Sequence, residues 1–247
     1  CFNPSGDGPN DRGTSKHHIF ESVENSLRSL KTDYIDIFFL HRSDFSIPLE
    51  EPLAALDVLV NQGKVRYVAC STHPSWRTAE ALFTAERFGY PKFICEQPPY
   101  NLLDRRIEME ILPMCRHFDL GAICWSPLAQ GTLAGRYTDP EKLPSSSRAS
   151  QKSVFAERIT REGIEAAAKM ADYAKKKGIT PAQFAVGWVI NQPVVTGSII
   201  GPRTLEQFRD LLPSAEIELT DEDQAFCDSL VPPRSHVSNH FNTTDWM

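Results

Sequence analysis

Side chains able to do chemistry follow the short apolar segments of this sequence. Residues 34–40 are apolar or aromatic except for Asp36, and they lead into His41 and Arg42. A short apolar run bounded by polar residues is typical of a strand buried on both faces of a parallel sheet. Parallel α/β enzymes place titratable groups at the carboxyl ends of such strands. The sequence therefore indicates His41 as a candidate catalytic group.

Four further apolar segments end on groups that can bind a ligand. These groups are Ser71 and Thr72, Gln97, Trp125 and Ser126, and Gly201 with Arg203. In a parallel barrel all the strand ends converge on one face. The set suits polarising a carbonyl and holding a flat ring that bears an amide. It has neither the paired carboxylates of glycosidases nor a Cys/His metal set, and Glu96 is expected to point away from Gln97.

A glycine turn leads directly into a helix near residue 204. Backbone N–H groups and the positive end of the helix dipole then point at one spot, which favours an anion. Arg203 adds a guanidinium whose fork geometry suits a phosphate. Gln207 has a second explanation, because Thr204 and Gln207 have the spacing of a capping box.

The elements that must position these groups alternate regularly. Strands are expected to start near 34, 65, 93 and 121, with a last strand over 194–200. Helices are expected at about 16–30, 48–62, 75–88, 105–118, 161–177, 181–191, 204–212 and 221–230. A long connection covers 126–153 and a tail covers 231–247. The roughly 30-residue spacing is that of a βαβ unit and predicts an α/β fold of the (β/α)8 TIM-barrel type. Five strands are counted, so the barrel is expected to be incomplete, with the first βα units preceding residue 1, in a single domain over 1–247.

The composition of the chain limits the classes of molecule that it is expected to bind. The chain has 247 residues, a net charge of −6 and a pI of about 5.7, without a Lys/Arg stripe, so nucleic acid and anionic membranes are not expected partners. There is no apolar run long enough to span a membrane and no signal segment. The six cysteines form no CxxC pair. They predict a reducing, cytoplasmic location and neither a disulfide framework nor a metal site.

Several runs together resemble one family. They are residues 26–41, 63–67, 97–102, 125–131 and 199–204. On these runs the chain resembles the aldo-keto reductase superfamily, whose members are (β/α)8 barrels that transfer hydride between NADP(H) and an aldehyde or ketone. The resemblance implies that His41 matches the catalytic histidine that orients the carbonyl of a small-molecule substrate.

The resemblance also implies a cofactor site. Ser71 and Gln97 match residues that bind the nicotinamide carboxamide, Trp125 stacks on the ring, and the following loop wraps the pyrophosphate. Arg203 and Gln207 match the adenosine end, where an arginine favours NADP over NAD. The implied cofactor-binding residues are Ser71, Thr72, Gln97, Trp125, Ser126, Pro127, Leu128, Gln130, Gly131, Leu133, Ile200, Gly201, Pro202, Arg203 and Gln207.

The sequence departs from the family pattern in three ways. Thr72 stands where the family usually has Asn, and Leu211 where many members have an Asn that binds the adenine. The proton-donor Tyr, its partner Lys and the Asp of the family lie before the histidine strand and have no match here. An alternative is therefore a catalytically incomplete, nucleotide-binding or scaffold protein, whose open sheet edges favour self-association.

Overall fold

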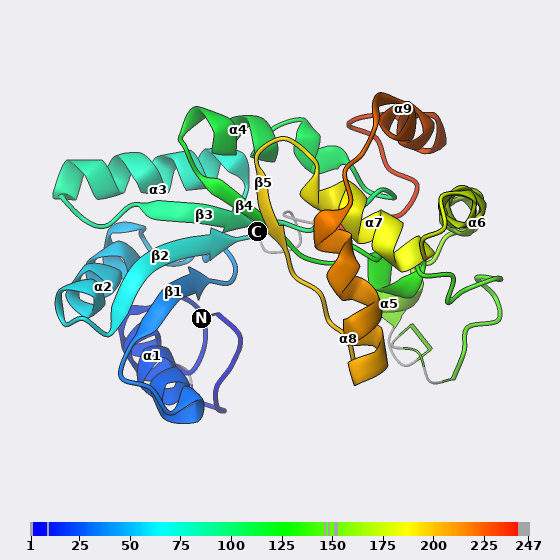
Figure 1. The fold of residues 1–247 in the computed structure, drawn as a ribbon. Coiled ribbons are helices and arrows are strands. Elements are labelled where there is room, and N and C mark those ends of the chain that lie inside the picture. Colours follow the sequence, from blue (N-terminus) through cyan, green and yellow to red (C-terminus); the bar gives the residue numbers. More distant parts are fainter. Residues whose placement is uncertain (1, 9, 146, 148, 151–152, 242–247) are drawn as a thin grey trace. The chain divides into compact units, whose positions relative to one another are not determined.

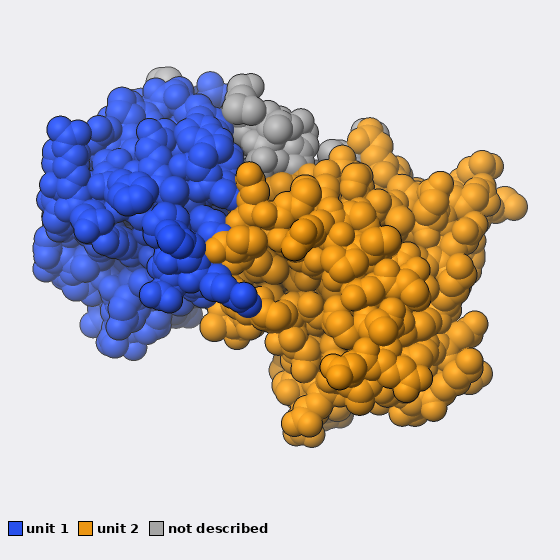
Figure 2. Space-filling view, turned by 90° about the horizontal axis from the view of Figure 1, so that it is seen from above, with its two compact units in different colours: residues 1–98, 114–121, 242–247 blue, residues 99–113, 122–241 orange. Residues whose placement is uncertain are grey.

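A computed structural model describes the chain except residues 1, 9, 146, 148, 151–152 and 242–247. It contains a five-stranded sheet in the order β1-β2-β3-β4-β5 (Figure 1). The pairs β1–β2, β2–β3 and β4–β5 are parallel. This confirms the predicted α/β class and agrees with part of a (β/α)8 barrel. The chain forms two compact units, residues 1–98 with 114–121 and 242–247, and residues 99–113 with 122–241 (Figure 2). The single domain over 1–247 stays a prediction, and each unit is described by itself.

The first unit alternates helices and strands as predicted. Its elements are α1 (Lys16–Leu30), β1 (Ile35–Leu40), α2 (Glu50–Asn61), β2 (Val65–Ser71), α3 (Ser75–Phe88) and β3 (Phe93–Gln97). Ser15 caps α1 by accepting a hydrogen bond from the backbone N–H of His18. Lys31 and Gly89, both left-handed, end α1 and α3.

Strand β1 is not buried on both faces, which corrects the expectation for residues 34–40. Phe38 and Leu40 are buried, whereas the intervening Phe39 is only half-buried. On neighbouring strands Tyr67 is 55% and Ile94 38% exposed. Helices α1, α2 and α3 accompany β1–β3 (Figure 1), and the Cys70 thiol lies 3.9 Å from the Thr78 hydroxyl of α3. Part of the strand face that the helices do not cover keeps water contact.

The helix expected over 105–118 is wrong. The chain forms a 3₁₀ turn, η1 (Arg106–Glu108), followed by the short helix α4 (Ile111–His117). Pro113 explains the break, because a continuous helix would need the backbone N–H that proline lacks. With α4 starting at Ile111, Pro113 falls in the first turn, where no intrahelical acceptor is available for that group anyway.

The second unit carries the remaining elements. They are β4 (Gly121–Cys124), η2 (Ala129–Gly131), α5 (Ser153–Ala156), α6 (Arg161–Lys176), α7 (Pro181–Ile190), β5 (Val195–Ser198), α8 (Leu205–Leu211), η3 (Leu212–Glu216) and α9 (Asp221–Leu230). Met114–Gly121, with the end of α4, belongs to the first unit. Trp188, Tyr100 and Phe184 are fully buried and form the large-residue core of the second unit. Capping boxes begin α7 at Thr180 and α9 at Thr220.

The described part of the tail, residues 231–241, packs on the segment that follows β3. The Asp104 carboxylate accepts hydrogen bonds from the backbone N–H groups of His240 and Phe241, at 2.7 and 2.8 Å. The N–H of Val237 donates to the carbonyl of Leu103 at 2.9 Å. These contacts fix the tail as far as Phe241. Among the described helices, none is both long and apolar enough to cross a bilayer.

Candidate active site and cofactor-binding residues

The strand ends of the first unit bring three predicted site residues together. Leu40 pairs with Cys70, Cys70 with Glu96, and Ser71 with Gln97. His41 directly follows Leu40, so the register places it at the level of Ser71. The carboxyl ends of β1, β2 and β3 therefore bring His41, Ser71 and Gln97 to neighbouring backbone positions.

The ends of β2 and β3 are joined through Gln97. The Ser71 hydroxyl donates to the Gln97 carbonyl at 2.9 Å, and the N–H of Thr72 donates to the same oxygen at 3.3 Å. Ser71 and Thr72 are buried, whereas the Gln97 side chain is half-exposed. Since the Ser71 proton is used in this bond, its oxygen remains able to accept a hydrogen bond from an amide NH₂ group.

His41 lies beside the N-terminal segment. Its Nδ1 is 3.4 Å from the side-chain nitrogen of Asn3. Partial burial and the nearby Arg42 charge lower the pKa of His41 from its usual 6.5, which favours the neutral imidazole. If the Asn3 amide donates to Nδ1, the ring proton is on Nε2, which then faces a ligand as a donor.

A cavity of about 290 Å³ adjoins His41. Its lining includes Phe2, Asn3 and Phe38 together with Ser22, Asn25 and Ser26 of α1. The size is at the lower end for small-molecule pockets, which are roughly 300 Å³ and larger. Neither Ser71 nor Gln97 lines it, so the cavity adjoins His41 on the α1 side only.

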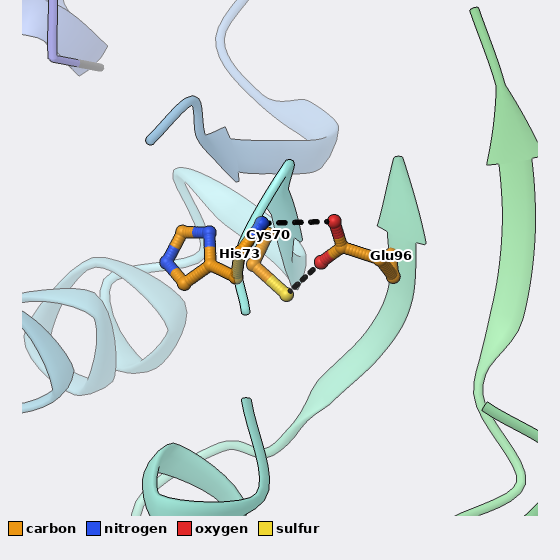
Figure 3. Close-up of side chains that lie close together, drawn as sticks. All are labelled: Cys70, His73 and Glu96. Carbon is orange, nitrogen blue, oxygen red and sulfur yellow. Dashed lines mark hydrogen bonds between the residues drawn. The ribbon is translucent and has the colours of Figure 1, made fainter. Parts of the chain in front are cut away.

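Glu96 is a buried carboxyl group to which the sequence analysis gave no role. It accepts hydrogen bonds from the Cys70 thiol at 2.7 Å and from the backbone N–H of His73 at 3.1 Å (Figure 3). Burial raises the pKa of Glu96 to about 7, against the lowering effect of these bonds. Burial, followed by the Glu96 charge, raises the pKa of Cys70 well above 9. A glutamate inside an otherwise apolar strand is the sequence signal that could have identified it.

Cys70, His73 and Glu96 also have the residue types of a metal site. One potential ligand atom from each lies within 4.8 Å of the others. The His73 Nδ1 nevertheless pairs with the Ser71 carbonyl at 3.1 Å, and Figure 3 shows the ring turned away from the other two side chains. Burial lowers the pKa of His73 to about 4. The arrangement is that of a buried carboxyl group that accepts hydrogen bonds from the Cys70 thiol and the His73 N–H.

The loop after β4 in the second unit has an unusual backbone. Ser126, Ala129 and Gln130 have φ values of 58°, 47° and 59°, and Gly131 has 100°. Left-handed non-glycine residues are uncommon and cluster at ligand-binding sites. Trp125 is half-exposed and pairs with Pro99, and the Asn101 amide donates to the Ser126 carbonyl at 3.2 Å. The loop is thus held in a specialised conformation at its predicted position.

Backbone hydrogen bonds within the loop close a tight turn after Leu128. The N–H groups of Gly131 and Leu133 both donate to the Leu128 carbonyl, at 2.8 and 3.2 Å. Pro127 and Leu133 are buried, and the side-chain oxygen of Gln130 is buried without a protein partner among the described residues. Leu133 is therefore a supporting core residue.

The segment after β5 partly confirms the predicted cap. Gly201 and Arg203 are exposed, and Ile200 and Pro202 half-exposed. Thr204 accepts from the N–H of Gln207 at 3.2 Å, but the Gln207 side chain accepts from the N–H of Arg203 at 2.8 Å, not from Thr204. Gln207 therefore has a capping role one residue earlier than a capping box requires. Helix α8 has only seven residues, so the exposed Arg203 guanidinium is the main anion-attracting group here.

The implied cofactor set is divided between the units. His41, Ser71, Thr72 and Gln97 lie in the first, and Trp125–Leu133 and Ile200–Gln207 in the second. Within each unit the residues lie next to one another along adjacent strand ends or one loop. The convergence of both groups on one ligand stays a prediction.

Comparison with known proteins identifies the family. A model described as "Aldo/keto reductase family" matches residues 2–232. "Uncharacterized oxidoreductase YrpG" of Bacillus subtilis (strain 168) is 38% identical over 217 residues, covering 87% of this chain and 64% of the relative. "Aldo-keto reductase AMT2" of Alternaria alternata is 34% identical over 235 residues, covering 94% and 63%.

A third relative has a different kind of name. "Probable voltage-gated potassium channel subunit beta" of Arabidopsis thaliana is 32% identical over 216 residues, covering 86% of this chain and 66% of the relative. The chain thus spans just under two thirds of the length of these relatives. With the family model matched over nearly all of its residues, the chain belongs to the aldo/keto reductase family.

Proposed function

We propose that the protein is an NADP(H)-dependent oxidoreductase that reduces an aldehyde or ketone to an alcohol. The observation that supports this most directly is the register of β1, β2 and β3, which aligns His41, Ser71 and Gln97 at the carboxyl ends of adjacent strands. Family membership supplies the reaction class.

The residues of the first unit fit a nicotinamide. The half-exposed Gln97 amide can bind the carboxamide, and the Ser71 oxygen keeps acceptor capacity for its NH₂ group. When bound, the reduced nicotinamide supplies the hydride that reaches the carbonyl carbon. His41 donates a hydrogen bond from Nε2 to the carbonyl oxygen, and so orients and polarises it while keeping its own proton. Solvent water supplies the proton that the reduced oxygen takes up.

The residues of the second unit fit the rest of the dinucleotide. Trp125 offers an aromatic face, and the left-handed loop with Ser126, Leu128 and Gly131 suits close approach to a pyrophosphate. Arg203 offers an exposed guanidinium for a 2′-phosphate, which favours NADP over NAD.

The test combines binding and turnover. We expect the purified protein to bind NADPH and to oxidise it with a panel of aldehydes and ketones. His41→Ala should lower kcat by about a hundredfold or more while NADPH binding is kept, because this residue faces the carbonyl. His17→Ala, which changes an exposed histidine of α1, is the matched control. Turnover that survives in the His41 variant would remove the assigned role.

Cofactor choice is tested at Arg203. Arg203→Ala should weaken NADPH binding by about tenfold or more and leave NADH unchanged, because a charge-assisted phosphate contact is worth about 1.5–3 kcal/mol. Arg209→Ala, which changes an exposed arginine on the helix that follows Arg203, is the control. Equal losses for NADPH and NADH would contradict the 2′-phosphate assignment.

A second candidate function is a nucleotide-binding scaffold without turnover. The potassium-channel subunit name among the relatives favours it. It predicts NADPH binding without oxidation, and self-association through the open strand edges. Light scattering of the purified chain, together with the turnover assay, separates the two candidates.

A cytoplasmic location belongs to the same proposal. Its support is that Cys70, Cys95, Cys115, Cys124 and Cys227 are all free and buried. Thiol titration of the denatured, unreduced protein from its source cell should find all six cysteines of the sequence reduced.

A further inference from the structure

We propose that Glu96 is a positioning residue of the cofactor site: its ionised carboxylate holds the end of β2 in the conformation that presents Ser71, so cofactor affinity depends on its charge. This inference rests on the proposed nicotinamide-binding function of Ser71 and Gln97. Glu96 itself is buried and touches neither the substrate side of the strands nor the solvent.

The contacts of Glu96 bracket the residue that it would position. One carboxylate oxygen binds the thiol of Cys70, which immediately precedes Ser71, and the other binds the N–H of His73, two residues after it (Figure 3). The Ser71 carbonyl is in turn paired with the His73 ring at 3.1 Å. The carboxylate therefore fixes both sides of Ser71.

The backbone between these contacts is strained. Thr72 has a φ of 53°, a left-handed conformation that β-branched residues avoid. Such a conformation persists only where the surroundings determine it. The bonds that do so are the Thr72 N–H to the Gln97 carbonyl and the His73 N–H to Glu96. Losing the second bond would allow this turn to relax and move the Ser71 hydroxyl.

A local irregularity in β3 places Glu96 opposite Cys70. Val68 pairs with Phe93, but Cys70 pairs with Glu96, so the register shifts by one residue between them. Irregularities of this kind re-aim side chains next to functional sites. Here the shift puts Glu96 opposite Cys70 and leaves Gln97 opposite Ser71.

Glu96 is the group of this cluster that changes charge near neutral pH. The surrounding thiols of Cys70, Cys95 and Cys115 have pKa values raised well above 9, to about 11 and to about 12, and stay neutral. The pKa of His73 is lowered to about 4, so its ring is neutral as well, and Arg42 stays charged throughout. Glu96, with a pKa of about 7, is half-ionised in that range.

Protonation of Glu96 weakens its contacts with Cys70 and His73 without removing both of them. A neutral carboxyl group accepts a hydrogen bond from an N–H about half as strongly as a carboxylate does. The oxygen that faces the thiol becomes a donor, and the contact survives only as a weak hydrogen bond to the Cys70 sulfur, which is a poor acceptor. If only the ionised form were competent, NADPH affinity would rise by about tenfold between about pH 6 and about pH 8.

The experiment measures NADPH dissociation constants over this pH range for the native protein and for Glu96→Gln. The native protein should bind several-fold more tightly at the higher pH, up to the limit of about tenfold. The cofactor phosphate and His41 also titrate, and both proteins share them. The NADPH dissociation constant of the variant should therefore change with pH only by this shared, weaker effect. Equal pH profiles for the two proteins overturn the inference.

A second measurement needs no variant. The backbone amide resonance of His73 should titrate with a midpoint near the Glu96 pKa of about 7 in the free protein, and the midpoint should fall when NADPH is bound. A midpoint that NADPH does not move overturns the inference while leaving NADPH binding intact. A native protein that binds no NADPH at any pH overturns the proposed function itself.

Discussion

Replacing Arg105 with methionine should destabilise the protein by about 3 kcal/mol, near the low end of the roughly 3–5 kcal/mol for breaking a buried ion pair. The Arg105 side chain is 3% exposed and donates to Glu108, Asp228 and the Val231 carbonyl at 2.7, 2.7 and 2.8 Å. Methionine can fill the space beside Trp188 but donates nothing.

The magnitude follows from what each partner retains. Glu108 is 14% exposed and keeps the hydroxyl of Tyr100, at 2.7 Å, so its charge is not left bare. Asp228 is 38% exposed and can turn to water. The Val231 carbonyl loses its donor at a buried residue, which alone costs about 1–3 kcal/mol. Together these terms favour the lower end of the range.

Urea unfolding followed by circular dichroism measures the change, with the slope checked for two-state behaviour. Lys92→Met is the control, because Lys92 pairs with Glu86 at 3.2 Å where both side chains are more than half exposed. That variant should lose less than about 1 kcal/mol. If the Arg105 variant loses no more than the control, the ion-pair reasoning is refuted.

Three further predictions concern the strand ends and the loop. Folding raises the pKa of Glu96 from 4.5 to about 7, so the folded state binds more protons than the unfolded state in this range. The free energy of unfolding should therefore fall as pH rises from about 4.5 to about 7, by up to about 3 kcal/mol. Urea unfolding at the two ends of this pH range should show this fall for the native protein and not for Glu96→Gln. Thr72→Asn should stabilise the protein by about 1 kcal/mol, since asparagine tolerates the left-handed backbone better than threonine, and an unchanged or lower melting temperature would contradict this. Gly131→Ala should weaken NADPH binding, because its φ is 100° and an added Cβ would lie 3.1 Å from a neighbouring arginine side chain. Gly135→Ala shares the backbone strain, because its φ is 73°, but its Cβ would meet nothing within 4 Å, so it should leave binding unchanged.

Most elements could be predicted because their signals are local. Apolar periodicity and caps such as Ser15 and Thr180 determine where helices begin, and the structure places α1 and α7 accordingly. The continuous helix expected over 105–118 was wrong because Pro113 interrupts it, which the apolar periodicity does not show, and because the start of the segment depends on a distant partner. Arg105 binds Asp228, more than a hundred residues away in sequence, and no local pattern shows this.

The strand-end residues of the candidate site could be predicted from local sequence, whereas the role of Glu96 and the partner of Gln207 could not. Strand ends identify His41, Ser71 and Gln97, because a parallel sheet presents its carboxyl ends at one edge. The role of Glu96 depends on a register shift and on burial, which sequence alternation alone does not reveal. The partner of the Gln207 side chain differed from expectation for a similar reason, since a shift of one residue in an exposed turn leaves the residue pattern unchanged.

The register shift in β3 also constrains how this sequence can evolve. Because side chains alternate along a strand, inserting or deleting one residue between Phe93 and Gln97 would exchange the faces of the last two positions. The carboxyl group would then be at the cofactor edge and the amide against the helices. We expect this short strand to tolerate many substitutions of similar size but no change of length, which a library of single-residue insertions and deletions scored for NADPH binding can measure.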